Sequence, residues 1–197
     1  STGTAICGGS AIAAISPIIR AKNNIISIAL VIVFLLNSIA LLLFPPIGHF
    51  LELSQEQFGL WCAIAIHDTS SVVGATIGYG EEALRIATTV KLSRTLWIIP
   101  LSIFSMFLFK NKGEKIRVPY FILFFIAAII INSYHLLPEA TTEFIVLGAK
   151  RLLIATLFLV GSSISVKDLK SLGPRPIVFA LSLWIFISLF SLAYILS

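Results

Sequence analysis

Charged side chains are scarce in this sequence of 197 residues, of which 12% are Asp, Glu, Lys or Arg. A soluble domain carries about a quarter charged residues. Hydrophobic residues make up 58% of the chain, and the mean hydropathy is +1.03. Because so apolar a chain has little surface that suits water, the composition excludes an ordinary soluble domain and predicts a protein whose solvent is the lipid bilayer.

Motifs for soluble enzyme chemistry are missing as well. His49, His67 and His135 form no HExxH pair, and the sequence contains neither a GxGxxG nor a Walker motif. Cys7 and Cys62 have no spacing typical of a disulfide framework or a metal site. The 14 Lys and Arg residues lie in short clusters rather than along one basic face, which argues against a nucleic-acid partner. We therefore expect no enzyme activity, no metal and no cofactor.

Long apolar runs are abundant, and stretches of about 20 residues are long enough to cross a hydrocarbon core. The predicted spans are 1–19, 24–44, 57–80, 88–109, 118–134, 144–163 and 177–196. Segments 1–19 and 57–80 are rich in Gly, Ser and Thr, which predicts broken or tightly packed helices. Residues 81–109 are expected to form one continuous helix. The predicted fold is an all-α bundle of transmembrane helices, some of them broken.

Lys and Arg residues gather in the loops 110–117 and 164–176, which predicts that both loops are cytoplasmic. The loop between them, 135–143, contains two Glu residues and no Lys or Arg, as expected of an external loop. The C-terminus is then expected outside. Arg20 and Lys22 face outward if residues 57–80 cross the membrane fully, and inward if these residues form a re-entrant hairpin. The full crossing is the favoured expectation.

Asp68 is the acidic residue that falls inside a predicted span, and it follows His67. A charge near the bilayer centre costs about 3 kcal/mol, so it needs a compensating role. If the helix unwinds over 67–71, its freed backbone groups and the hydroxyls of Thr69, Ser70 and Ser71 can line a polar cavity. The alternative is that Asp68 merely caps a second half-helix.

The start of the chain has a similar character. Hydroxyl-bearing and glycine residues there predict a loosened helix whose N-terminal N–H groups suit an anion. The candidate ligands are Thr4, Cys7, Gly8, Gly9 and Ser10. Cys7 is expected to act as a small packing residue rather than as a nucleophile, because no basic partner lies near it in the sequence.

Lys91 and Arg94 are three residues apart, which places them on the same face of a helix. One hypothesis is that they attract an anion or pair with Asp68. The alternative is that both side chains extend to the membrane interface, as long cationic side chains near helix ends do.

These motifs together resemble a family of bacterial multi-pass inner-membrane proteins named as sulfate exporters. The resemblance rests on Gly3–Ala14, Ile66–Val73, Val90–Arg94 with Pro100, and Asn132–Ser133 with His135–Pro138. Family members are expected to be longer by several N-terminal spans, which implies that this chain is the C-terminal part of such a protein. The resemblance also implies ten or eleven helices in two inverted repeats, with broken helices crossing near the midplane.

The function expected from these features is secondary transport of a small anion, sulfate or another sulfur compound, coupled to a proton or sodium gradient. The substrate would bind to Thr4, the run Cys7–Ser10, Thr69–Ser71, Lys91 and Arg94, and the coupling ion to His67 and Asp68. One alternative is a cation/proton antiporter in which Asp68 carries the ion. Others are an intramembrane hydrolase with Ser70 as nucleophile and His67 as base, and a non-catalytic assembly subunit. Association of the protein into a homo-oligomer is a further hypothesis.

Overall fold

The computed structural model describes residues 6–108, 124, 127–128, 130–131, 134, 137–163 and 174–197. Within these ranges the regular structure is helical and no strand occurs, which confirms the predicted all-α class. Thr4, the loop 110–117 and most of the predicted span 118–134 lie outside the described residues, as does most of the loop 164–176.

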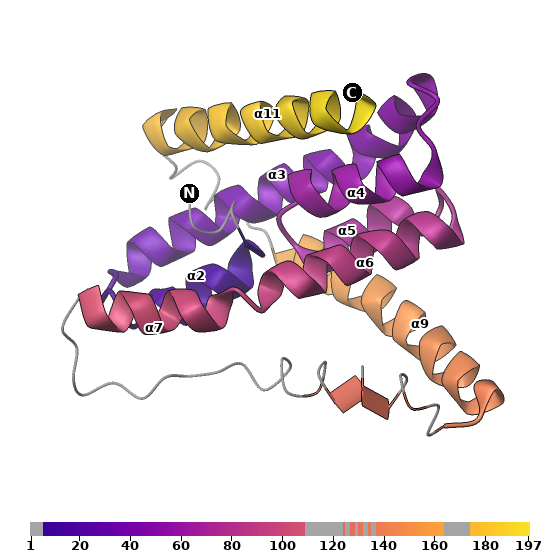
Figure 1. Cartoon of the computed structure of the whole chain (residues 1–197). Helices are drawn as coiled ribbons and strands as arrows, with labels where there is room; N and C mark the ends of the chain where they lie inside the picture. Colours follow the sequence, from indigo (N-terminus) through magenta and orange to yellow (C-terminus); the bar gives the residue numbers. More distant parts are fainter. Residues whose placement is uncertain are drawn as a thin grey trace.

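Helices α3 (Asn23–Phe50) and α11 (Pro174–Leu196) are long and apolar enough to cross a membrane, with mean hydropathies of 2.8 and 2.2 in their most apolar windows. Only 28% and 17% of these windows are buried. Figure 1 shows α11 along the edge of the bundle, with α3 between α11 and α2. Because their apolar side chains are mostly exposed, they fit a lipid environment rather than a soluble core. Helix α3 contains the predicted span 24–44 and continues through Pro45 and Pro46 to Phe50.

Helices α4 (Gln55–Ala65) and α5 (Thr69–Thr76) form a hairpin. The Tyr79 hydroxyl, just after α5, donates a 2.7 Å hydrogen bond to the Leu53 carbonyl, just before α4. The chain therefore returns to the end of the bundle from which α4 started (Figure 1). The full crossing favoured for residues 57–80 is wrong. With 11 and 8 residues, the two helices are about 16 and 12 Å long, each short of a hydrocarbon core of about 30 Å.

Helix α6 (Glu81–Thr95) runs beside α4 in the same direction, and α7 (Ile98–Leu108) continues its course. Helices α4 and α6 approach closely at Gly59, where an added Cβ would lie 2.8 Å from the Ala83 carbonyl oxygen. The predicted continuous helix over 81–109 is wrong, because a turn at Leu96 and Trp97 interrupts it. Pro100 explains the turn, since it has no N–H to bond the carbonyl of Leu96.

The largest apolar core lies where α3, the hairpin, α6 and α11 meet. Its centre is an aromatic stack in which the rings of Phe44 and Trp61 are 4.1 Å apart, with Trp184 beside Phe44. The Trp61 indole N–H donates to the Ser188 carbonyl at 3.0 Å, which fixes α11 against α4. This core holds the hairpin in place.

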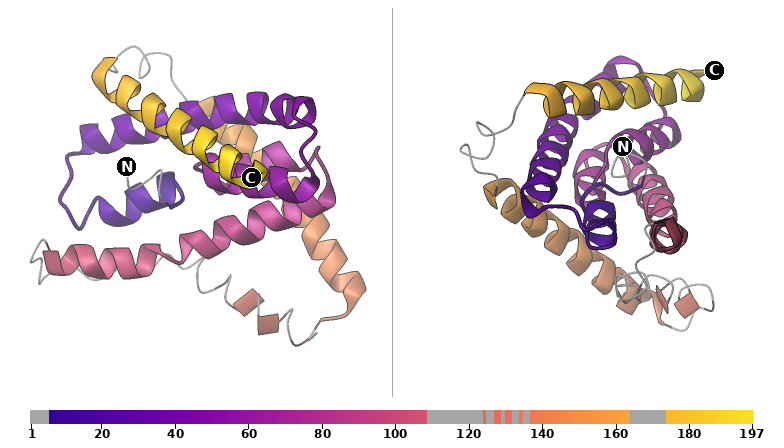
Figure 2. Two further views of the ribbon diagram at one scale, coloured as in Figure 1. Left: turned by 45° about the horizontal axis from the view of Figure 1, so that its top comes forward. Right: turned by 90° about the vertical axis from the view of Figure 1, so that its left-hand side faces the viewer.

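Two further helices flank this bundle (Figure 2). The short α2 (Gly9–Ile15) packs between α3 and α7, and α9 (Glu139–Ser163) packs against α5 and extends away from the other helices. Gly8, just before α2, lies against His67 at the tip of the hairpin.

Candidate functional site

The tip of the hairpin, Ile66–Asp68, is the break that separates α4 from α5. Asp68 ends the break and caps the start of α5. Its carboxylate accepts hydrogen bonds from the Ser70 and Ser71 N–H groups at 3.0 and 3.3 Å. The predicted unwinding over 67–71 is therefore too long, because Thr69, Ser70 and Ser71 form the first turn of α5. The capping alternative for Asp68 is correct in geometry, and the carboxylate remains half-buried.

The carbonyl end of α4 is covered by two cationic side chains from α6. The Lys91 amine donates to the Ile66 carbonyl at 2.5 Å and, more distantly, to that of Ala63 at 3.4 Å. The Arg94 guanidinium donates to the carbonyls of Ala63 and Ile64 at 2.7 and 3.3 Å. These carbonyls have no partner within α4, and the last turn of a helix carries about half a negative charge. The two cations therefore stabilise a helix end that stops inside the bundle.

A third side chain completes this cap. The indole N–H of Trp184 in α11 donates to the Ala65 carbonyl at 3.1 Å. The four carbonyls from Ala63 to Ile66 thus all accept a side-chain hydrogen bond, which is the condition for ending a helix away from water.

Lys91 is the most deeply buried of these cations, with 0% of its surface exposed, and Arg94 is half-buried. The alternative in which Lys91 extends to the membrane interface is therefore wrong. Among the described residues, no ion pair joins Lys91 to Asp68 either. Sequence spacing correctly placed Lys91 and Arg94 on one face. It did not predict their bonds to the α4 carbonyls, because backbone carbonyls freed by a break leave no pattern in sequence.

The segment before α2 crosses the hairpin tip at Gly8. This residue has φ +57°, and an added Cβ would lie 2.9 Å from Val33 Cγ1 and 3.2 Å from His67 Cβ. Gly8 is thus required both by the backbone conformation and by the close approach. Its neighbour Cys7 is 2% exposed and packs in the small core with Ile98, as expected for a packing residue.

Gly9 and Ser10 are not brought to the tip in the same way. Gly9 faces α3, where its nearest atoms belong to Leu30 and Phe34. Ser10 lies in the first turn of α2 and is half-buried. Helix α2 has 7 residues and begins at Gly9.

Asn37 is a site residue that sequence reasoning missed. It lies midway along α3, is 1% exposed, and accepts a 2.9 Å hydrogen bond from the backbone N–H of His67. The amide nitrogen of Asn37 and both ring nitrogens of His67 have no hydrogen-bond partner within the described part of the chain. Each such group costs about 1–3 kcal/mol, so native structures keep few of them. The available signal was an Asn in the middle of the apolar run 24–44.

The unpartnered ring of His67 also bears on the hydrolase alternative. A Ser nucleophile needs a base that accepts its proton through a hydrogen bond. Since neither ring nitrogen has a partner in the described ranges, the hydroxyl of Ser70 is not hydrogen-bonded to this imidazole. The pair that this alternative requires is not assembled here.

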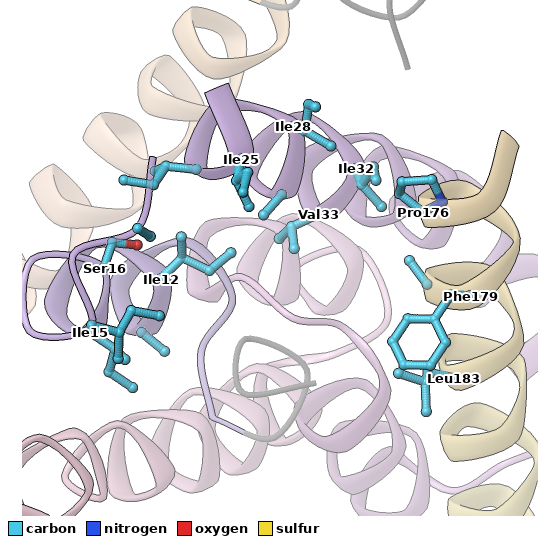
Figure 3. A pocket seen from close by; sticks show the side chains of 16 residues that line it. Ile12, Ile15, Ser16, Ile25, Ile28, Ile32, Val33, Pro176, Phe179 and Leu183 are labelled. Atoms are coloured by element: carbon cyan, nitrogen blue, oxygen red, sulfur yellow. The ribbon is translucent and has the colours of Figure 1, made fainter. Parts of the chain in front are cut away.

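A separate apolar cavity of about 450 Å³ lies between α2, α3 and α11 (Figure 3). Ile12, Ile15, Ile28 and Phe179 are among its lining side chains, and Ser16 contributes a hydroxyl. None of the predicted site residues lines it. Its hydrocarbon walls do not suit a small anion, so the polar cluster at the hairpin tip is the candidate functional site.

Comparisons with known proteins agree with the membrane environment of this fold. The family model described as conserved hypothetical protein 698 matches residues 1–180. Relatives named UPF0324 membrane protein are 54% identical over 196 residues in Bacteroides thetaiotaomicron, 53% over 195 in Photobacterium profundum and 56% over 200 in Porphyromonas gingivalis. No solved structure matches this chain. These names state a membrane protein and no substrate, so the sulfate export implied by the resemblance stays a prediction.

The matched regions cover nearly all of this chain but not of its relatives. They include 99%, 99% and 100% of this chain, against 59%, 60% and 60% of the three relatives. The chain thus spans about 60% of the length of the curated relatives that it matches.

Proposed function

This chain belongs to the conserved hypothetical protein 698 family of membrane proteins, and we propose that it forms the substrate-binding part of a secondary transporter for a small anion. The coupling ion is a proton or sodium, and the membrane is the bacterial plasma membrane, which the protein crosses several times. Sulfate and other sulfur oxyanions are the first substrates to test.

The observation that carries this proposal is the burial of Lys91 together with Arg94 at the hairpin tip. Ionisable groups held at the centre of a membrane bundle mark ion or substrate paths. Two cations and the single carboxylate of Asp68 leave an excess of positive charge there. The partial negative charge at the end of α4 and the partial positive charge at the start of α5 offset each other. The excess of positive charge therefore remains, and it favours an anion over a cation.

The proposed roles follow from the contacts. Lys91 and Arg94 supply positive potential at the hairpin tip. Asp68 fixes the start of α5 and is the carboxylate available to the coupling ion. His67 directly follows Ile66, whose carbonyl accepts from Lys91, and belongs to the same cluster.

Charges at the two ends of the bundle support an orientation. Lys22 at the start of α3 and Arg175 at the start of α11 lie at one end (Figure 1). Glu52, Glu56 and Glu81 flank the base of the hairpin at the other. Because Lys and Arg are in excess on the cytoplasmic side of membrane proteins, these charges support a cytoplasmic location for the first end. The hairpin thus removes the conflict that a full crossing created for Arg20 and Lys22.

This orientation predicts which sites a membrane-impermeant maleimide reaches in intact spheroplasts. Glu56→Cys and Glu81→Cys are expected to react from outside, because both residues are exposed at the hairpin base. Lys22→Cys is expected to react only after permeabilisation. The native Cys7 and Cys62 are 2% and 0% exposed and serve as an unreactive background. Labelling of Glu56→Cys and Glu81→Cys from opposite sides would contradict the hairpin.

Transport itself is tested with the full-length gene product in liposomes. Arg94→Ala is expected to lower gradient-driven uptake of sulfate or another anion about tenfold or more, because one charge-assisted contact is worth about 1.5–3 kcal/mol. Arg85→Ala is the matched control on α6, since Arg85 is exposed and pairs with Glu82. Equal uptake by Arg94→Ala and Arg85→Ala would refute the assigned role.

The same assay separates coupling from binding. Asn is as good an N-cap as Asp, so Asp68→Asn is expected to keep α5 capped while removing the charge. Uptake by this variant should no longer respond to the imposed proton or sodium gradient. A response to sodium or potassium without any anion would instead favour the cation/proton antiporter.

A further inference from the structure

The apolar cavity between α2, α3 and α11 is open on one side. Its floor includes Ala11, Ile32 and Val33, which are 0%, 6% and 8% exposed. Ile25 and Phe179 also line it and are 58% and 59% exposed, so they lie at its opening. The cavity is therefore a groove between helices rather than an enclosed void, and a ligand can enter it from the side.

The walls of this groove select an apolar occupant. Figure 3 shows Ile12 and Ile15 of α2 opposite Phe179 and Leu183 of α11, with α3 between them. Its volume of about 450 Å³ is that of a pocket for a small ligand. Cavities lined in this way stay free of water and take up apolar molecules. Since the exposed faces of α3 and α11 suit lipid, an acyl chain is the apolar group available at the opening.

Basic side chains adjoin one end of the groove. Arg20 and Lys22 flank Ala21 in the sequence, and Ala21 lines the groove. Arg175 directly precedes Pro176, which lines the groove from α11. All three basic residues are exposed, next to the starts of α3 and α11 (Figure 1). The groove thus joins an apolar interior to a cationic end.

The helices that form the groove supply no acidic partner for these cations. Residues 1–51 and 169–197, which include α2, α3 and α11, contain neither Asp nor Glu. Within the described part of the chain, Arg20, Lys22 and Arg175 form no ion pair. Their positive charge is therefore available to an anionic group that does not belong to these helices.

The backbone at Arg20 adds a second argument. Its φ is +50°, and the turn after α2 is closed by a 3.0 Å hydrogen bond from the Ala21 N–H to the Ser16 carbonyl. Glycine is the usual residue at this place after a helix, because a Cβ is strained in the left-handed conformation. An arginine held there despite the strain supports a role for its guanidinium.

We infer that this groove binds one molecule of an anionic phospholipid. An acyl chain occupies the groove, and the phosphate lies beside Arg20 and Arg175, since guanidinium groups match the geometry of phosphate oxygens. The charges give the selectivity, because an acyl chain gains little by leaving one apolar environment for another. This site is separate from the hairpin tip, so the inference does not depend on anion transport.

The first test compares phosphatidylglycerol with phosphatidylcholine of the same acyl chains. Each lipid is titrated onto the purified full-length protein in detergent, and binding is measured by native mass spectrometry. Phosphatidylglycerol is expected to bind about tenfold or more tightly. Equal binding of the two lipids would overturn the inference. So would the absence of any bound lipid, which would mean that other parts of the full-length protein cover the groove.

The second test removes one charge without straining the fold. Arg20→Gly relieves the left-handed backbone, so its stability in lipid-free detergent is expected to equal or exceed that of the wild type. Its affinity for phosphatidylglycerol should nevertheless fall about fivefold. Arg85→Gln is the control, because it removes an exposed arginine of α6 outside the groove. Equal phosphatidylglycerol binding by Arg20→Gly and Arg85→Gln would refute the headgroup site.

The third test fills the groove and leaves its charges in place. Ala29 lines the groove, so Ala29→Phe is expected to lower the affinity for both lipids about tenfold while keeping the preference for phosphatidylglycerol. Ala193→Phe is the control, because Ala193 is exposed on α11 and does not line the groove. If both variants bind phosphatidylglycerol equally, the acyl chain does not lie in the groove and the inference fails.

Discussion

Lys91→Met is expected to abolish gradient-driven anion uptake and to destabilise the protein by about 2 kcal/mol, because the Ile66 carbonyl loses its donor. A buried unpaired carbonyl costs about 1–3 kcal/mol, whereas removing a buried charge relieves part of its desolvation cost. Methionine has a similar length and keeps the surrounding packing. The loss is measured by unfolding in detergent, with uptake measured in liposomes.

Two further variants separate charge from packing at this position. Lys91→Arg keeps a cation and several donors, and we expect it to retain more stability and uptake than Lys91→Met. Lys22→Met removes an exposed Lys at the N-cap of α3 and should leave both quantities nearly unchanged. If Lys91→Met matches Lys22→Met in stability, the amine does not cap α4, and the account of the hairpin tip is wrong.

Much of this site follows from sequence because its elements are local. Small and hydroxyl-bearing residues predicted the break between α4 and α5, and Asp before Thr-Ser-Ser is a helix N-cap pattern. The spacing of Lys91 and Arg94 fixed their common face. Each of these features depends on neighbours within one turn of helix, which a single sequence contains.

The direction of the chain after the break could not be predicted in the same way. Hydropathy shows how long a segment stays in the membrane, but a hairpin and a full crossing of equal length have the same composition. The deciding contacts join Leu53 to Tyr79 and Gln55 to Glu82, which are distant in sequence. The positive charges of Arg20 and Lys22 were the available hint, because a full crossing of residues 57–80 would place both outside the cell.

Asn37 was missed for a related reason. One Asn in an apolar helix is inexpensive to pack against a polar neighbour, so its identity alone predicts nothing about a site. Its importance comes from the His67 N–H that it accepts, and that contact exists only because the hairpin ends beside the middle of α3. Tertiary structure, rather than local pattern, makes this residue a candidate ligand.

The close approach of Gly8 to the hairpin tip predicts a second substitution with a large effect. Gly8→Ala is expected to destabilise the protein by about 3 kcal/mol, because a Cβ is strained at φ +57° and would lie 2.9 Å from Val33 Cγ1. Unfolding in detergent measures the loss. Uptake should fall with it, because the same Cβ would lie 3.2 Å from His67 Cβ and displace the hairpin tip.

Gly9→Ala is the matched control for this substitution. Gly9 is the first residue of α2, its nearest neighbouring atom would be 3.6 Å from the added Cβ, and alanine favours a helix over glycine by about 0.5–1 kcal/mol. We therefore expect Gly9→Ala to be neutral or slightly stabilising. If Gly8→Ala and Gly9→Ala behave alike, the N-terminal segment does not cross the hairpin at Gly8. Lys91, Arg94 and His67 would then lack the second interrupted segment that encloses them, and the anion site would lose one of its walls.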